Sequence, residues 1–279
     1  MSEQIFEVSV TAGIAHLQLI RPDKANSMNA EFWQQFPTAI RQLDYSGEVR
    51  ALVISSTGKH FCSGMDLEIF SNPDPDTFGG EPSRRAEAVA RLVTQLQQVI
   101  NVLEEVRFPV LTAIQGGCIG GALDLVCAAD MRYCTEDAYF VVKETEIGMT
   151  ADLGTLQRLP QLIAPGLARE LAYTARKMSA QEAKDSGLVN RIYSNQQQML
   201  DEVLAIAAQI ASRSPMAVSG SKKMINYARD HSLADSLQQM AIWQAAMFHP
   251  ADMAASLSAR MSGNPPQYQP LKAHKKLFS

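Results

Sequence analysis

The sequence predicts an α/β fold followed by a helical region, and two patterns indicate it. Short apolar runs that favour strands alternate with longer segments of helical periodicity through most of the 279 residues. From Gln196 onward the pattern is almost entirely helical, with breaks at Ser214-Pro215 and His249-Pro250. Because this alternation favours a parallel sheet covered by helices, we expect a core over residues 1–200 and a helical region over residues 201–279.

The chain opens with a predicted hairpin and a polar loop. Phe6–Thr11 and Ile14–Leu19 favour strands on either side of a short Gly-containing turn. The loop RPDKANSMN, residues 21–29, is rich in turn residues. It can be a plain connection, or a polar loop whose Arg21 and Lys24 are available to a phosphate group.

A helix and a buried strand come next. Residues 30–43 carry apolar side chains at helical spacing, after Asn29 as a favoured N-cap residue. Pro37 should kink this helix or mark its true start. Ala51–Ser55 is a short apolar run typical of a buried strand, and the loop Thr57–Leu67 that leaves it is a favoured place for function.

The middle of the chain alternates loop, helix and strand. Ser71–Ser83 is rich in Pro, Gly and Asp and has no period, which predicts a mobile loop that can act as a lid. A long amphipathic helix follows from about Arg84 to Val106. The apolar run from Pro109 to Ile114 then predicts a buried strand that ends at a Gly-rich turn.

The remaining elements follow from the same patterns. Strands are predicted at residues 130–135, 138–142 and 188–193. Helices are predicted at residues 120–129, 155–162 and 166–176, and another opens at the capping box Ser179-Ala-Gln-Glu182.

Composition narrows the class of protein. The net charge is −4, and no basic stripe is present, which argues against a nucleic-acid partner. No apolar run approaches the roughly 18 residues that a membrane-spanning helix needs, so no membrane partner is expected. The first residues lack a secretory apolar core, and the final KKLFS is no peroxisomal signal. We therefore expect the protein in the cytoplasm.

Metal sites and covalent nucleophiles are not predicted. The four cysteines form no CxxC pair and read as buried small apolar residues, and the five histidines have no ligand spacing. Ser63 lies in CSG and not in the GxSxG of a nucleophile elbow. A P-loop and a G-x-G-x-x-G motif are absent, which counts against a nucleotide cofactor held in that way.

The stretch from Gln115 to Asp152 carries the strongest functional pattern. Two pairs of glycines precede an apolar helix, whose unpaired N-terminal amides suit a developing oxyanion. Gly121 stands where such a donor would lie, and one donor can contribute roughly 3–4 kcal/mol. Asp124, Glu144 and Asp152 lie within or beside apolar sequence. The combination predicts proton transfer next to a carbonyl group.

Each of these residues also has a plainer interpretation. The glycines can serve a tight turn, and Asp124 can simply interact with its own helix dipole. Glu144 can be a solvated charge at a strand end, and Asp152 can be an N-cap. Burial would raise the pKa of Asp124 and the helix end would lower it, and the sequence does not decide between them.

Several motifs resemble one family over most of the chain. FCSGMDL (residues 61–67) and GGCIGGALDLVCAADMRYC (residues 116–134) are similar to the crotonase, or enoyl-CoA hydratase/isomerase, superfamily, as are RPDKANSMN and AKDSGLVNRIY. Hydratases of that family have Glu at two positions twenty residues apart. Here the first is Asp124, and Asp152 is added after Glu144, a pattern that resembles the dienoyl-CoA isomerases of the superfamily.

The resemblance implies a fold and an activity. The fold is a crotonase-type spiral of ββα units with a helical C-terminal region that builds trimers, commonly paired into hexamers. The activity is the isomerisation of 3,5-dienoyl-CoA to 2,4-dienoyl-CoA through a dienolate, in unsaturated fatty acid β-oxidation. No separate cofactor is implied, because coenzyme A is part of the substrate.

The resemblance also implies roles for individual residues. The backbone N–H groups of Met65 and Gly121 would form the oxyanion hole for the thioester oxygen. Glu144 would exchange the proton at C2 and Asp152 the proton at C6, while Asp124 would tune or assist them.

A further set would contact coenzyme A: Arg21, Lys24, Ala25, Asn26, Lys59, Ser63 and Asp66. Basic residues of the tail would help from a neighbouring subunit: Lys272, Lys275 and Lys276.

Other functions on the same fold stay open. An enoyl-CoA hydratase or a Δ3-Δ2-enoyl-CoA isomerase would need a shorter proton shift or none, although Asp124 in place of Glu argues against ordinary hydration. A non-catalytic acyl-CoA-binding member is the third possibility, and three carboxylates in apolar surroundings argue against it.

Overall fold

The computed structural model of the protein describes residues 4–71 and 74–274. Its main sheet has the strand order β1 (Phe6–Thr11), β2 (Ile14–Leu19), β3 (Ala51–Ser56), β4 (Val110–Ile114), β6 (Met131–Thr135) and β9 (Arg191–Tyr193). Neighbouring strands are parallel except for β1 and β2, which form the predicted antiparallel hairpin.

A second, smaller sheet explains how the chain coils. It consists of β5 (Gly117–Ile119), β7 (Tyr139–Val141) and β8 (Met178–Ser179). The chain runs from β4 in the main sheet to β5 in the small one and into helix α5 (Gly121–Ala128), and then from β6 to β7. Two isolated β-bridges connect earlier segments of the chain to this arrangement, one between Cys62 and Cys118 and one between Met28 and Met65. The result is the expected spiral of strand, strand and helix.

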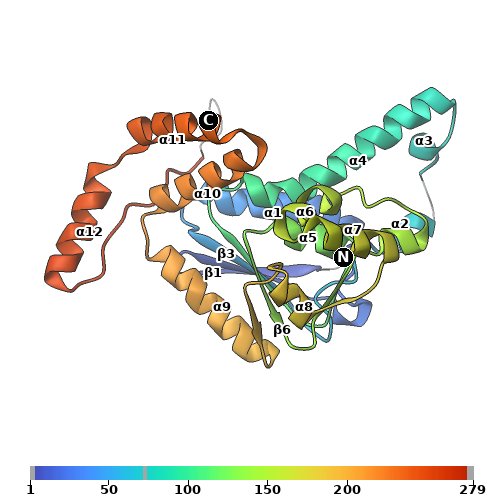
Figure 1. Ribbon diagram of the computed structural model, residues 1–279, viewed down its shortest axis with the longest axis horizontal. Coiled ribbons are helices and arrows are strands. Elements are labelled where there is room, and N and C mark those ends of the chain that lie inside the picture. The colour runs from blue at the N-terminus through green and yellow to red at the C-terminus, as the bar shows by residue number, and fades with distance from the viewer. Residues whose placement is uncertain (1–3, 72–73, 275–279) are drawn as a thin grey trace.

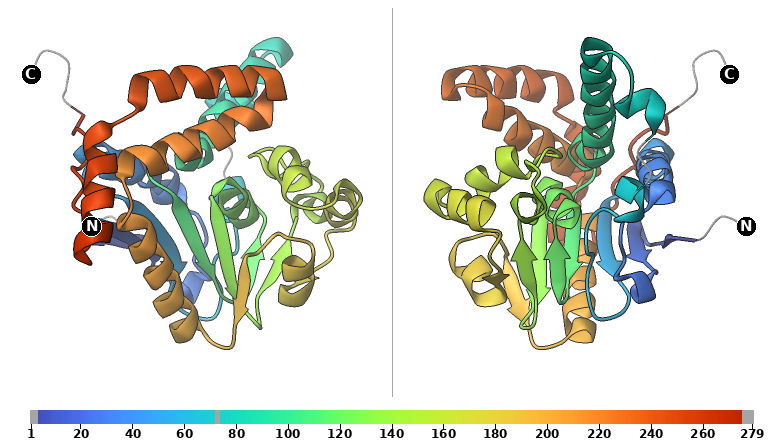
Figure 2. Two further views of the ribbon diagram at one scale, coloured as in Figure 1. Left: turned by 60° about the vertical axis from the view of Figure 1, so that its left-hand side comes forward. Right: turned by 90° about the vertical axis from the view of Figure 1, so that its right-hand side faces the viewer.

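Helices cover both faces of the main sheet (Figures 1 and 2). The helices of the core are α1 (Ala30–Ser46), α2 (Glu68–Ser71), α3 (Pro75–Phe78), α4 (Pro82–Glu105), α6 (Thr155–Leu162), α7 (Pro165–Thr174), α8 (Ala180–Asp185) and α9 (Gln196–Ala211). Two short 3-10 helices add to them, η1 (Pro22–Lys24) and η2 (Glu144–Ile147).

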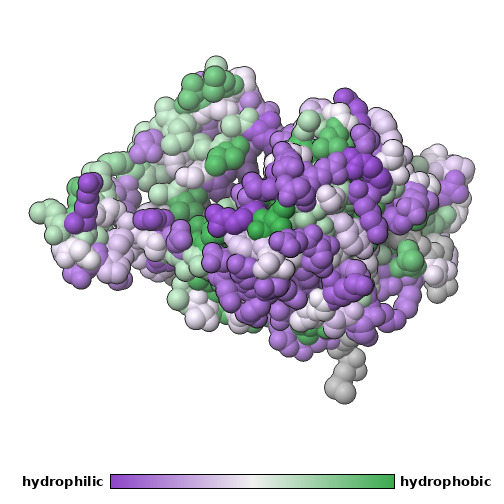
Figure 3. All heavy atoms as spheres, turned by 60° about the horizontal axis from the view of Figure 1, so that its bottom comes forward, coloured by the Kyte–Doolittle hydropathy of each residue, from purple (hydrophilic) through white to green (hydrophobic). Residues whose placement is uncertain are grey.

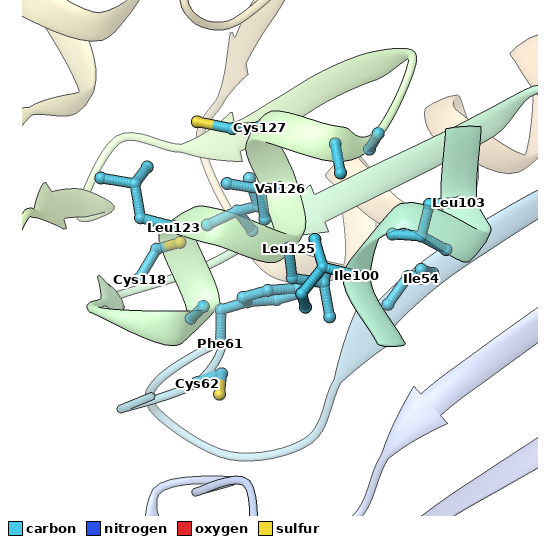
Figure 4. Packing of buried hydrophobic residues seen from close by; sticks show 14 of the residues in the cluster. Ile54, Phe61, Cys62, Ile100, Leu103, Cys118, Leu123, Leu125, Val126 and Cys127 are labelled. Carbon is cyan, nitrogen blue, oxygen red and sulfur yellow. The ribbon is translucent and has the colours of Figure 1, made fainter. Parts of the chain in front are cut away.

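Strand β3 shows why the strands of the main sheet appear in the sequence as continuous apolar runs. All six of its residues are buried, because successive side chains point to opposite faces and both faces are covered. Ala51 and Val53 pack in a cluster with residues of α9, whereas Leu52 and Ile54 belong to the larger core formed with α1, α4 and α5. Figure 4 shows Ile54 in that larger core, among side chains of α4 and α5.

The start of α1 follows the prediction, and its interior does not. The side chain of Asn29 caps the helix by accepting a hydrogen bond from the amide of Phe32. The helix then continues through Pro37 to Ser46, so Pro37 does not mark its start. Phe36, Pro37 and Ile40 are all buried, and this apolar burial offsets the backbone hydrogen bond that proline cannot make.

Two segments differ from the sequence expectation. The predicted loop over residues 71–83 contains α3 and the first turn of α4, each opened by an acidic N-cap followed by proline, Asp74-Pro75 and Glu81-Pro82. Residues 72 and 73 of that loop lie outside the described residues. The Gly-rich turn also contains a strand, β5, because its backbone pairs with β7.

The C-terminal region begins with α9, which still belongs to the core. This helix crosses the predicted boundary at residue 200, and its Met199, Val203 and Ala207 are buried against the sheet. The helices α10 (Pro215–Asp230), α11 (Leu233–Met247) and α12 (Pro250–Ser262) then extend to one side of the molecule (Figure 1). Across the described chain, no helix has the length and apolarity needed to cross a membrane.

Candidate active site

Two backbone amides meet where the loop after β3 passes the start of α5. The amide nitrogen of Met65 lies 3.6 Å from the position that a Cβ on Gly121 would occupy. The bridge between Met28 and Met65 uses the carbonyl of Gly64 and the amide of Asp66, so the Met65 amide faces the other way. Gly121 is the first residue of α5, where a helix has no internal partner for its amide. Within the described ranges, neither amide donates a hydrogen bond, so both are available to an oxyanion.

Glycines allow these two amides to approach each other. Gly64 has φ +89°, and a Cβ on it would lie 2.6 Å from the carbonyl oxygen of Ile119 and 3.2 Å from the nitrogen of Gly121. Gly120 also has a positive φ, +54°. Any side chain at Gly64 would therefore push the two backbone segments apart. The two interpretations of these glycines are compatible, because the tight turn itself brings the two free amides together.

Helix α5 is anchored at its other end by a buried guanidinium. All eight residues of α5 are buried, and Figure 4 labels four of them in the core: Leu123, Leu125, Val126 and Cys127. Arg132 donates from Nη1 to the carbonyls of Val126, at 3.1 Å, and Ala129, at 2.6 Å, and from Nε to Leu188 O, at 2.7 Å. A cation at the C-terminal carbonyls of a helix is favourable, so Arg132 fixes the helix whose first amide serves the site. Neither Arg132 nor its role follows from the sequence motifs.

Asp124 is buried and caps a different helix from its own. Its side chain is 1% exposed, and its Oδ1 accepts a hydrogen bond of 2.6 Å from the amide of Thr155, the first residue of α6. Burial raises the pKa of Asp124 to about 7, against the lowering effect of Thr155 and with a further increase from the charges of Glu144 and Asp152. Burial therefore has a larger effect on the pKa of Asp124 than the helix N-terminus, a balance that the sequence alone does not decide.

Glu144 lies beside the glycine that precedes α5. It opens η2, three residues beyond the end of β7, and its Oε1 lies 3.3 Å from the position of a Cβ on Gly120. Its Oε2 is buried and has no hydrogen-bond partner in the described part of the chain. Burial raises the pKa of Glu144, and the charge of Asp152 raises it further. The alternative that Glu144 is a solvated strand-end charge is wrong.

Asp152 completes the carboxylate cluster. It is half-buried, and burial raises its pKa. It is not an N-cap, since the N-cap of α6 is Gly154. The structure thus brings together Asp124, Glu144 and Asp152 beside the first turn of α5, close enough for their charges to influence one another.

The loop predicted to meet coenzyme A is tied to the segment that carries Met65. Arg21 is 6% exposed; its Nη1 donates to the carbonyl of Ser27 at 2.8 Å and lies 3.6 Å from Oδ2 of Asp66. Asp66 also accepts from the hydroxyl of Ser27, and the amide of Ser63 donates to the carbonyl of Ala25. The expectation that Arg21 is available to a phosphate group is therefore corrected, because burial and these contacts place it inside the loop.

Asn26 is also held inside the loop by hydrogen bonds, whereas Lys24 and Lys59 are not. The side chain of Asn26 donates to the carbonyls of Thr57 and His60 and accepts from the amide of Arg21. Lys24 and Lys59 are exposed, and Lys24 is 3.9 Å from Glu68. Of the predicted basic contacts in this region, these two lysines remain at the surface.

In the tail, Lys272 is exposed, while Lys275 and Lys276 lie outside the described residues.

The part of the chain that the structure describes contains no group of His, Cys, Asp and Glu side chains that could hold a metal ion.

A pocket of about 370 Å³ lies against the segment between Asp152 and α6. Side chains of α4, α6 and α10 line it, together with Leu153 and Gly154. Gln97 in its wall donates a hydrogen bond of 2.7 Å to the backbone carbonyl of Asp152. Neither this pocket nor the role of Thr155 is predictable from the sequence, because both depend on residues far apart in the chain.

Known proteins with similar sequences and folds agree on one family. Residues 9–269 match the sequence model of the family described as enoyl-CoA hydratase/isomerase. A mitochondrial Δ(3,5)-Δ(2,4)-dienoyl-CoA isomerase of Mus musculus is 43% identical over 93% of this chain and 80% of its own. A peroxisomal enzyme of the same name from Arabidopsis thaliana is 38% identical over 96% of this chain and 97% of its own. The crystal structure of an enoyl-CoA hydratase from Bacillus anthracis superposes with a TM-score of 0.86, at 28% identity, over 98% of this chain and 100% of that one.

Proposed function

The chain belongs to the enoyl-CoA hydratase/isomerase family, and on that premise we propose that it converts 3,5-dienoyl-CoA into 2,4-dienoyl-CoA. The observation that carries the proposal is the cluster of Asp124, Glu144 and Asp152 beside two unpaired backbone amides. Relatives at 38% and 43% identity bear the name of dienoyl-CoA isomerase, which agrees with that chemistry. The protein is then an isomerase that acts on an acyl-CoA in the β-oxidation of unsaturated fatty acids.

The reaction begins at the carbon next to the thioester. The amides of Met65 and Gly121 hold the thioester oxygen, which makes the C2 proton more acidic and stabilises the dienolate. We assign the removal of this proton to Glu144, because its carboxylate lies beside Gly120, the residue that precedes the proposed oxyanion donor. Its unpartnered Oε2 is the atom that takes the proton.

The reaction ends four carbons further along. The electron pair of the broken C2–H bond delocalises to C6, where Asp152 delivers a proton and leaves the double bonds at C2 and C4. Two separate carboxylates are needed because one group does not reach both carbons. Asp124, whose pKa is raised to about 7 by burial, keeps the net charge of the cluster low while Glu144 is ionised.

The substrate supplies its own coenzyme A. A proton shift changes no oxidation state, so the reaction needs no further cofactor. We assign the exposed Lys24 and Lys59 to the phosphate groups of coenzyme A, with Ala25 and Ser63 contributing backbone where their two loops meet. Arg21, Asn26 and Asp66 shape the loop from inside.

The C-terminal helices point to a homo-oligomer. Neither α11 nor α12 has a buried residue, and both carry exposed apolar side chains: Leu233, Leu237, Ile242, Met253, Leu257 and Met261. Figure 3 shows hydrophobic atoms gathered on the side of the C-terminal helices, next to a largely hydrophilic body. We propose that copies of the chain cover this surface in a homotrimer or homohexamer. Four free, buried cysteines agree with a reducing compartment, and we propose the cytoplasm.

Ordinary hydration is not favoured. A hydratase of this family would use two glutamates to hold water, whereas here the first position is Asp124 and its carboxylate is engaged by the Thr155 amide.

The direct test is a spectroscopic assay with 3,5-octadienoyl-CoA and the pure protein. We expect the ultraviolet absorbance of a conjugated 2,4-diene to appear, and Glu144→Gln to abolish it. Glu146→Gln is the matched control, since Glu146 is exposed and pairs with Lys143 at the surface. The absence of conjugated product with the wild-type protein, or faster hydration of crotonyl-CoA, would overturn the proposal.

A further inference from the structure

An ion network joins three helices behind the segment that carries Asp152. Glu104 of α4 receives a two-pronged contact from Arg158 of α6, with Nε 3.1 Å from Oε1 and Nη2 2.8 Å from Oε2. Arg229 of α10 binds the same carboxylate. The side chains of Arg158 and Glu104 are 12% and 16% exposed, whereas that of Arg229 is 31% exposed, so the Arg158–Glu104 pair is the better shielded part of the network. A two-pronged guanidinium–carboxylate pair fixes the orientation of both groups.

The network remains ionised in the fold. Burial alone would raise the pKa of Glu104, but Arg158 and then Arg229 lower it overall. Removing one partner would leave a shielded charge without compensation.

Arg158 also holds the backbone next to Asp152. Its Nη1 donates to the carbonyl of Leu153 at 3.4 Å, and its Nη2 donates to Oδ1 of Asn101 at 2.7 Å. The guanidinium lies across Gly154, where a Cβ would be only 1.9 Å from Nη1. Gly154 has φ +122°, a backbone conformation that favours glycine. Arg158 thus occupies the space that this glycine leaves open.

The segment needs such support because it has no regular structure of its own. Residues 149–154 form neither helix nor strand, in contrast to Glu144, which lies in η2. The backbone at Glu144 has a side-chain support of its own, a hydrogen bond from the hydroxyl of Thr145 to the carbonyl of Ala172. One backbone hydrogen bond, from the amide of Met149 to the carbonyl of Glu144 at 2.9 Å, joins it to the segment of Asp152. The side chains that support the two proposed proton-transfer groups are therefore different.

We infer that Arg158 is a positioning residue that sets Asp152 at C6 of the substrate, without affecting Glu144 at C2. This inference rests on the proposed function. It means that Arg158 controls how the dienolate partitions between two fates. Asp152 adds a proton at C6 to give product, or Glu144 gives a proton back at C2 to restore the substrate. Gln97 supports the same segment through the Asp152 carbonyl.

The test follows both fates of the dienolate in D2O. With 3,5-octadienoyl-CoA, deuterium at C2 of recovered substrate reports the step of Glu144, and formation of the 2,4-diene reports the step of Asp152. For Arg158→Gln we expect product formation to fall about 10- to 100-fold, as for other small displacements of a reacting group, while C2 exchange and KM stay close to wild type. Arg158→Lys keeps the charge without the two-pronged contact, and it should lie between wild type and Arg158→Gln.

Two more variants complete the design. Glu104→Gln should shift the partition in the same direction as Arg158→Gln, and it serves if that variant does not fold. Arg176→Gln is the matched control, because Arg176 also bridges two carboxylates, Glu170 and Glu182, but lies away from the segment. It should leave the partition unchanged.

The outcomes separate the inference from the function on which it rests. An equal fall of exchange and product formation in the soluble, folded variants would mean a general structural role and overturn the inference. An unchanged partition would overturn it as well. If the wild-type protein forms no 2,4-diene, the proposed function itself fails.

Discussion

Asp124 Oδ1 and the amide nitrogen of Thr155 are joined by a hydrogen bond of 2.6 Å. This contact links the first turn of α5, which carries Gly121, to the first turn of α6, which follows Asp152. Gly121, the proposed oxyanion donor, and Asp152, the proposed distal proton donor, are therefore held relative to each other by a carboxylate of the same cluster. Asp124 combines an electrostatic role with a structural one.

Asp124→Asn should make the stability of the protein less sensitive to pH. Burial raises the folded-state pKa of Asp124 to about 7, above its ordinary value of 3.8. The stabilisation from the protonated carboxyl is thus complete below pH 3.8 and is lost as the pH rises toward 7. Asparagine keeps the acceptor for Thr155 and cannot ionise. Relative to wild type, the variant should gain on the order of a few kcal/mol between pH 4 and 8.

The measurement is urea unfolding at a series of pH values and one protein concentration. A difference between variant and wild type that stays flat over this range would mean that Asp124 does not change its charge in the fold.

Gly64→Ala should damage catalysis through the oxyanion hole. The new Cβ would lie 2.6 Å from the carbonyl of Ile119 and would separate the amides of Met65 and Gly121. We expect kcat to fall about 100- to 1000-fold, as when one oxyanion donor is removed. Gly263→Ala is the control, because Gly263 also has a positive φ, +73°, but has open space around it. Steady-state kinetics of both variants checks the prediction, and a wild-type kcat for Gly64→Ala would contradict it.

Lys222→Met should strongly destabilise the attachment of α10. Lys222 is buried and donates to the carbonyls of Leu103, at 2.6 Å, and Phe108, at 3.0 Å, and to Asp130, at 2.8 Å. Removing one partner of a buried ion pair costs about 3–5 kcal/mol. The neighbouring Lys223 is exposed and lies over the ring of Trp243, so Lys223→Met should cost about 1 kcal/mol or less. Chemical unfolding of the two variants side by side decides it, and equal losses would refute the assignment.

Charged substitutions on α11 and α12 should dissociate the oligomer. Leu237 is 62% exposed and Leu257 is 56% exposed. An aspartate at either position would be buried without a partner if the surface is an interface, so Leu237→Asp and Leu257→Asp should reduce the molar mass in solution. Gln238→Asp, an exposed polar position on the same helix, should not. Light scattering after size exclusion measures the mass, and a monomeric wild-type protein would disprove the interface.

Local patterns in the sequence determined much of the fold and the core of the site. The hairpin, the Asn29 cap and the main strands follow from the periodicity of neighbouring residues and from short-range capping, which operate within a few positions of the chain. The carboxylates and the Gly-rich helix start could be identified for the same reason, because their apolar surroundings are visible in the adjacent sequence.

Only the tertiary structure decided what those residues contact. The sequence predicts Arg21 as an exposed contact for phosphate, but in the fold its guanidinium is buried against Ser27 and Asp66. The sequence also assigns most of α9 to the C-terminal region, but this helix packs on the main sheet. The high pKa of Asp124 and its bond to Thr155 likewise depend on residues more than one element away. Desolvation and long-range hydrogen bonds are properties of the assembled core, and for this reason periodicity and motifs indicate which groups are present but not how the fold surrounds them.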